Sequence, residues 1–159
     1  MDDYVLVCTI VDEDLGSEVL HIAHDIGIGG GTVIKARGSV QSMILNLLGF
    51  DDDRKELCLN LISDVKEQRF LEAIEKRFEL KKAHHGLAFS LPVYAAIGLR
   101  KHKAFINKRE GDGKMDAIFI IVDRGIGEDV IHEAKEAGAS GATIMHARGS
   151  GIHLKEKIF

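Results

Sequence analysis

The chain contains an internal repeat at a fixed offset of 111 residues. Residues 7–40 align with residues 118–151 without a gap, and 14 of the 34 aligned positions are identical. A gapless match of this length predicts two copies of one structural unit. The identical pairs are Ile10/Ile121, Val11/Val122, Asp12/Asp123, Gly16/Gly127, Val19/Val130, His21/His132, Ala23/Ala134, Gly27/Gly138, Gly30/Gly141, Thr32/Thr143, Ala36/Ala147, Arg37/Arg148, Gly38/Gly149 and Ser39/Ser150.

Each copy has the pattern of a strand, a helix and a second strand. Branched apolar runs predict the strands, and each helix has acidic residues in its first turn and a glycine at its end. The expected first strands are 5–11 and 117–122, the helices 16–27 and 127–138, and the second strands 31–38 and 142–149.

The first copy continues beyond this βαβ unit. After a loop at 40–54, residues 56–62 predict a third strand and residues 63–78 a helix with Ser63 or Asp64 as its N-cap. Phe70, Ile74 and Phe78 share one face of that helix. Residues 86–99 predict a fourth strand, which Pro92 assigns to an edge or a bulge. The order βαββαβ predicts an α+β fold of the ferredoxin-like, split βαβ type, followed by a second partial βαβ repeat.

This pattern divides the chain into residues 1–99, a charged linker at 100–114 and a partial second repeat at 115–159. The linker includes Gly111-Asp112-Gly113-Lys114. In the split βαβ order a third strand fits between the first and second strands, and the second copy has no such strand in this sequence. Either a longer natural chain or another subunit supplies it.

The expected strands are apolar on both faces, although the helices of this fold cover only one face of the sheet. The runs YVLVCTIV, LCLNLI and AIFIIV show no polar alternation. The open face should therefore be buried, and self-association is the simplest way to bury it.

The composition narrows the function classes. A net charge of −4 and a pI near 6.0 argue against a nucleic-acid clamp or a polybasic membrane surface. No apolar run approaches the ~20 residues of a membrane span, and the acidic N-terminus is not a secretory signal, so we expect a cytoplasmic protein. Cys8 and Cys58 lie in apolar runs and should be buried, reduced thiols.

Three segments resemble the PII nitrogen-regulatory signalling family: GGGTVIKARGSVQS at 29–42, FLEAIEKRF at 70–78 and GLAFSLPV at 86–93. The resemblance covers residues 4–99 as a full unit and residues 116–159 as half of another. It implies a non-enzymatic signalling protein with a role in nitrogen regulation that forms trimers with inward-facing sheets. It also implies ATP or ADP in the clefts between units, 2-oxoglutarate beside the nucleotide, and a loop after the second strand that contacts a transporter, enzyme or regulator.

The family's ligand residues transfer only in part. Leu87 stands in place of the phosphate-binding lysine, and one of two later arginines remains. The ligand-binding residues that the resemblance implies are Thr32, Arg37, Gly38, Gly86, Arg100, Thr143, Arg148 and Gly149.

The loop after the second strand is apolar in its middle and has no tyrosine to modify. A solvated loop does not hold so many large apolar residues, so we expect Met43, Leu47 and Phe50 to dock on another unit or on a partner.

Other interpretations stay open. Strand-end Arg37 and Arg148 suit an anion, or they form ion pairs with Asp12 or Asp123 of the same copy. The pairs His21/His24 and His84/His85 allow a metal-binding trimeric protein of the same fold, and a scaffold without a ligand is a third possibility. No set of residues in the sequence suggests a catalytic nucleophile and base.

Overall fold

The structure, a computed structural model, describes residues 3–38, 53–98, 104–106 and 116–149. The chain forms two compact units. The first comprises residues 1–108 together with 147–159, and the second comprises residues 109–146. Each unit is described separately.

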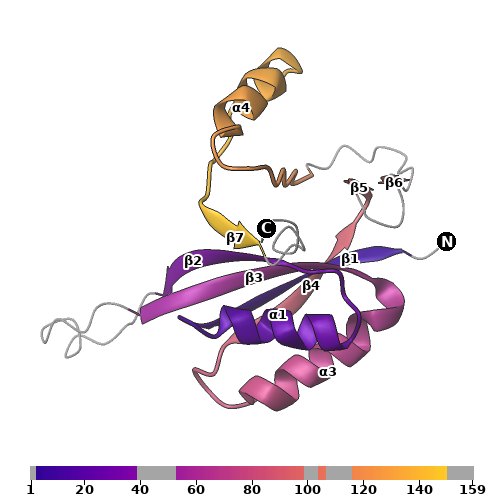
Figure 1. The fold of residues 1–159 in the computed structure, drawn as a ribbon, viewed down its shortest axis with the longest axis vertical. Coiled ribbons are helices and arrows are strands. Elements are labelled where there is room, and N and C mark those ends of the chain that lie inside the picture. Colours follow the sequence, from indigo (N-terminus) through magenta and orange to yellow (C-terminus); the bar gives the residue numbers. More distant parts are fainter. Residues whose placement is uncertain (1–2, 39–52, 99–103, 107–115, 150–159) are drawn as a thin grey trace, which may run out of the picture. The chain divides into compact units, whose positions relative to one another are not determined.

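The first unit is built on a five-stranded antiparallel sheet with the order β4-β1-β3-β2-β7 (Figure 1). The first four strands and two helices follow the order βαββαβ, which confirms the ferredoxin-like α+β fold. The elements are β1 (Tyr4–Asp12), α1 (Gly16–Asp25), β2 (Thr32–Gly38), β3 (Asp53–Ser63), a 3₁₀ turn (Asp64–Lys66), α3 (Glu67–Phe78), β4 (Leu87–Val93) and β7 (Ala147–Gly149).

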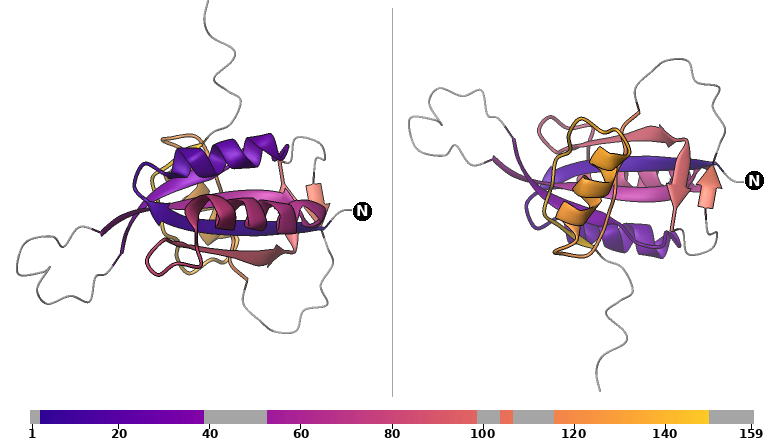
Figure 2. Two further views of the ribbon diagram at one scale, coloured as in Figure 1. Left: turned by 90° about the horizontal axis from the view of Figure 1, so that it is seen from below. Right: turned by 90° about the horizontal axis from the view of Figure 1, so that it is seen from above.

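Helices α1 and α3 lie side by side on one face of the sheet (Figure 2). Their apolar sides bury the main core, in which Phe70, Ile74 and Phe78 are the residues that α3 contributes. Val19 and Ala23 of α1 are fully buried in the same core. The apolar spacing of Phe70, Ile74 and Phe78 predicted the buried face of α3 correctly.

The opposite face of the sheet is also apolar, as the strand sequences predict. Cys8, Ile34 and Leu59 form a second buried cluster there. Leu87, Phe89 and Leu91 pair with residues of β1 on the same face and stay 39–54% exposed. This surface, the open face, holds large exposed apolar side chains at its β4 edge.

Several sequence predictions need correction. The chain enters α3 through a 3₁₀ turn, and Ser63 makes no side-chain cap hydrogen bond. Asp64 Oδ1 instead accepts the backbone N–H of Val65 at 2.8 Å. The third strand begins at Asp53, so the loop predicted at 40–54 is shorter; its residues up to 52 lie outside the described residues. The expected linker contains β6 (Ala104–Ile106), which pairs with β5 (Ala95–Ile97).

The second unit contains α4 (Gly127–Glu136), the expected helix of the second repeat. Residues 116–123 and 139–146 are not assigned as strands, because a strand needs a neighbour to pair its backbone groups. No residue of α4 is buried. No helix in the described ranges is long and apolar enough to cross a bilayer.

Candidate functional site

One end of the sheet of the first unit brings together three of the predicted ligand residues, Arg37, Gly38 and Gly86. There β1 and β2 end, while β3 and β4 begin. The register pairs Arg37 with Arg54 and Gly38 with Asp53. Gly86 precedes β4 beside Ile10 of β1, at the same end. We call this surface the charged sheet end.

Ion pairs cross the charged sheet end. Lys35 Nζ donates to Glu13 Oε1 at 3.2 Å, and Arg54 Nη1 donates to Glu13 Oε2 at 3.3 Å. The hydrogen bond from Lys35 in the first place, and the one from Arg54, hold the pKa of Glu13 below its usual range. Lys55 donates to Asp12. The charged side chains described at this sheet end are the cations Lys35, Arg37, Arg54 and Lys55 and the carboxylates Asp12, Glu13 and Asp14.

Thr32 and Arg37 do not face one ligand from a single side of β2. Successive side chains alternate between the faces of a strand, and five positions separate these two residues. Thr32 is paired with Leu59 and buried on the open face. Arg37 lies on the face that the helices cover, at its exposed end. The predicted ligand set is therefore split by the sheet.

Gly86 has a structural reason to be glycine. Its φ is +117°, and a Cβ would lie 2.4 Å from the carbonyl oxygen of Ile10. The neighbouring His85 donates through Nδ1 to the carbonyl oxygen of Phe78 at 3.2 Å, which fits the end of α3. Leu87, which stands in place of the family's lysine, is 54% exposed and offers no donor.

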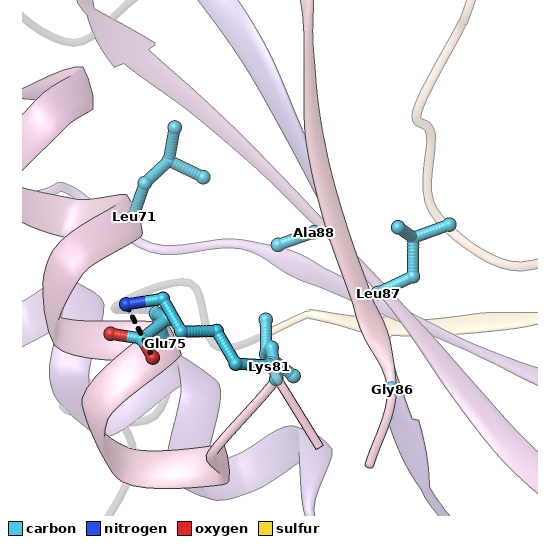
Figure 3. Close-up of a pocket in the computed structure, with 7 residues that line it drawn as sticks. Leu71, Glu75, Lys81, Gly86, Leu87 and Ala88 are labelled. Carbon is cyan, nitrogen blue, oxygen red and sulfur yellow. Dashed lines mark ion pairs between the residues drawn. The ribbon is translucent and has the colours of Figure 1, made fainter. Parts of the chain in front are cut away.

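A shallow hollow of about 310 Å³ lies beside Gly86, between α3 and β4 (Figure 3). Leu71, Leu80 and Ala88 give it an apolar wall. Glu75 and Lys81 form an ion pair at 3.3 Å across its rim. The hollow offers few polar groups for a phosphate.

Arg148 is not paired with Asp123, the partner proposed from its own copy. Its Nη2 donates to Oε1 of Glu56 in β3 at 2.8 Å. Gly149 pairs with Thr32 across the β2–β7 ladder. The structure therefore joins the end of the second repeat to the first repeat. For the first copy, the carboxylate of Asp12 binds Lys55.

Other predicted residues fall elsewhere. Thr143 belongs to the second unit and is exposed. Arg100 and the proposed partner-binding residues Met43, Leu47 and Phe50 lie outside the described residues.

Glu56 was not predicted as a site residue, and it is 1% exposed although it carries a carboxylate. The available signal was its position as the single acidic residue at the start of the apolar run ELCLNLI. Cys58, two residues along β3 on the same face, is a free, buried thiol. Cys8 on the open face is also free and buried, so the prediction of buried, reduced cysteines is confirmed. Burial first, and then the Glu56 carboxylate, raise the pKa of Cys58 to about 12.

Metal binding has little support from the part of the chain that the structure describes. It brings together no group of three or more His, Cys, Asp or Glu side chains that could hold an ion. His24 Nδ1 lies 3.8 Å from Oδ1 of Asp25, and both side chains are more than 80% exposed to solvent.

No known family model matches the chain, and no curated protein sequence matches it. Among solved structures, the chain is similar to the crystal structure of Arabidopsis thaliana PII bound to citrate. The TM-score is 0.52 and the identity is 21%, over 70% of this chain and 96% of that chain. This likeness establishes a shared fold.

Proposed function

We propose that the chain is a PII-like regulatory protein that binds a small anion at the charged sheet end and passes its state to a protein partner. The observation that carries this proposal is the cluster of Lys35, Arg37 and Arg54 where β2 ends and β3 begins. A strand-end arginine beside a glycine places a fixed guanidinium next to an open backbone, and this arrangement suits carboxylates and phosphates.

The chemistry of the site favours a carboxylate ligand over a nucleoside triphosphate. A polyphosphate needs several donors in a small space, and Leu87 supplies none. The PII structure with the same fold holds citrate, a tricarboxylate. We therefore place citrate and 2-oxoglutarate ahead of ATP and ADP as candidate ligands.

The open face supports self-association of the chain. Leu87, Phe89 and Leu91 are exposed beside a cluster that is already buried, so a second copy would extend an existing apolar contact. We expect a homo-oligomer, and a trimer by analogy with the PII family. Met43, Leu47 and Phe50 remain our candidates for contact with the regulated protein.

The proposed activity is regulatory. The charged sheet end offers guanidinium, ammonium and carboxylate groups that are paired with one another. Such groups bind and orient an anion, and this set contains no hydroxyl or thiol nucleophile.

Calorimetric titration of the purified chain with citrate, 2-oxoglutarate and Mg-ATP, each in a separate experiment, tests the proposal. We expect saturable heat with at least one carboxylate ligand and at least a tenfold loss of affinity in Arg37→Ala. Arg69→Ala is the matched control, because Arg69 is exposed on α3 near the opposite end of the sheet. Equal affinity in both variants, or no heat with any ligand at millimolar concentration, would refute the site.

A further inference from the structure

The outer edge of β2 carries a short strand from a distant part of the sequence. β7 lies beside β2 (Figure 1) and pairs antiparallel with Thr32–Ile34. The register of this pairing places Arg148 directly opposite Val33. Opposite residues in a ladder point to the same face of the sheet, so Arg148 lies on the face that the helices cover. A slip of one residue would turn Arg148 to the open face.

On that face Arg148 meets a buried carboxylate. Glu56 is 1% exposed, and its two oxygens have different donors. Oε2 accepts the backbone N–H of Gly16 at 2.7 Å, and Oε1 accepts Nη2 of Arg148 at 2.8 Å. A buried carboxylate is stable when its charge is matched and its oxygens are hydrogen-bonded. The first repeat supplies one of these donors, and the end of the second repeat supplies the other.

The carboxylate is held in position independently of Arg148. A Cβ at Gly16 would lie 2.6 Å from Oε2 of Glu56 and 2.9 Å from Cγ1 of Val33, so Glu56 fits there because residue 16 is glycine. Gly16 also opens α1, and the N–H groups of a first helical turn favour an anion. Glu56 therefore presents a preformed acceptor beside the outer edge of β2.

We propose that the outer edge of β2 and the Glu56 carboxylate form a docking site for a strand that carries arginine opposite Val33. We call this site the β2 docking edge. Its occupant is the segment Ala147–Gly149. The ladder supplies backbone hydrogen bonds without regard to sequence, and Glu56 adds selectivity for a guanidinium. A lysine ammonium is a more strongly hydrated point charge than a guanidinium and lacks its planar set of donors, so lysine would bind this carboxylate less well.

This site gives the two copies of Ala-Arg-Gly different roles. Arg37 lies within β2 itself, opposite Arg54, and belongs to the charged sheet end. Arg148 lies on the strand that occupies the β2 docking edge. The docking role stands independently of the proposed ligand, because it uses neither Arg37 nor the charged sheet end.

Hydrogen exchange on the full chain tests the docking role. In Arg148→Ala and in Arg148→Lys, we expect the outward-facing amides of Thr32–Ile34 to exchange at least tenfold faster than in the wild type. Arg124→Ala removes an exposed arginine of the second unit and should leave these amides unchanged. Unchanged protection of α3 in each variant shows that the fold is intact. Wild-type exchange at Thr32–Ile34 in Arg148→Ala would overturn the proposal.

A peptide titration tests the selectivity. A fluorescein-labelled peptide with the sequence of residues 142–150, ATIMHARGS, is added to the full Arg148→Ala chain and its anisotropy is measured. We expect saturable binding that weakens at least tenfold when lysine replaces the peptide arginine. The same loss is expected with the Arg148→Ala chain that also carries Glu56→Gln. Binding that does not depend on the peptide arginine, or no binding, would overturn the proposal.

Discussion

Gly86 lies so close to Ile10 that a Cβ at position 86 would be 2.4 Å from the Ile10 carbonyl oxygen. Its φ of +117° is also a conformation that side chains rarely adopt. We expect Gly86→Ala to lower the free energy of unfolding by roughly 1–3 kcal/mol, measured by urea denaturation. Gly29→Ala is the control, because a Cβ at Gly29 meets nothing within 4 Å. Equal stability of the two variants would contradict this reading of Gly86.

Ile74 anchors α3 in the core with no exposed surface. Its truncation to alanine removes buried methyl groups and leaves a cavity, so we expect a loss of about 2–5 kcal/mol in the free energy of unfolding. Val65→Ala should change stability little, because Val65 is 73% exposed. A loss below that of Val65→Ala would mean that the face of α3 is misassigned.

Glu56→Gln removes the charge that matches Arg148 and one acceptor oxygen. We expect a loss of roughly 1–3 kcal/mol in chemical denaturation. Glu133→Gln, on the exposed surface of α4, is the matched change and should have almost no effect. If Glu56→Gln were as stable as the wild type, the buried ion pair would be an unimportant contact.

Cys58 should make stability depend on pH in the alkaline range. Its pKa is raised from 9.0 to about 12 in the folded chain, so folding favours the neutral thiol. This contribution is complete below pH 9 and is lost as the pH rises towards 12, by up to about 1.4 kcal/mol per pH unit. Urea denaturation from pH 8 to 10.5 should show a steeper loss in the wild type than in Cys58→Ala. Parallel curves would show that Cys58 ionises freely.

A substitution at Phe89 tests whether the chain self-associates through the open face. Phe89→Glu places a charge among exposed apolar side chains, and we expect a smaller oligomer by size-exclusion chromatography with light scattering. Val65→Glu adds the same charge at an exposed position on the 3₁₀ turn that precedes α3 and should leave the mass unchanged. An unaltered mass in Phe89→Glu would place self-association on another surface.

Local sequence patterns predicted the elements that local interactions determine. The helices α1 and α4 end near Gly27 and Gly138, which adopt φ values of +76° and +98°. The spacing of Phe70, Ile74 and Phe78 identified the buried side of α3 because 3.6-residue periodicity is a property of the helix alone. Pro92 predicted that β4 lies at an edge or contains a bulge, and β4 is an edge strand of the sheet.

Long-range pairings were not predictable in the same way. Glu56 and Arg148 are 92 positions apart, and nothing in either local pattern selects the other residue as a partner. The edge pairing of β2 with β7 also depends on a choice between several strand edges. Thr32 and Arg37 were grouped by resemblance, although strand alternation sends them to opposite faces.

The two edge strands of the sheet differ in how readily they could pair with a strand of another chain. β7 covers the outer edge of β2 along Thr32–Ile34, and no strand in the described part of the chain pairs with the outer edge of β4. Pro92 removes one donor from β4, and edge prolines impede the addition of further strands. At the other end of the sheet the edge strand is β7, which has only three residues, and very short edge strands limit pairing with another chain.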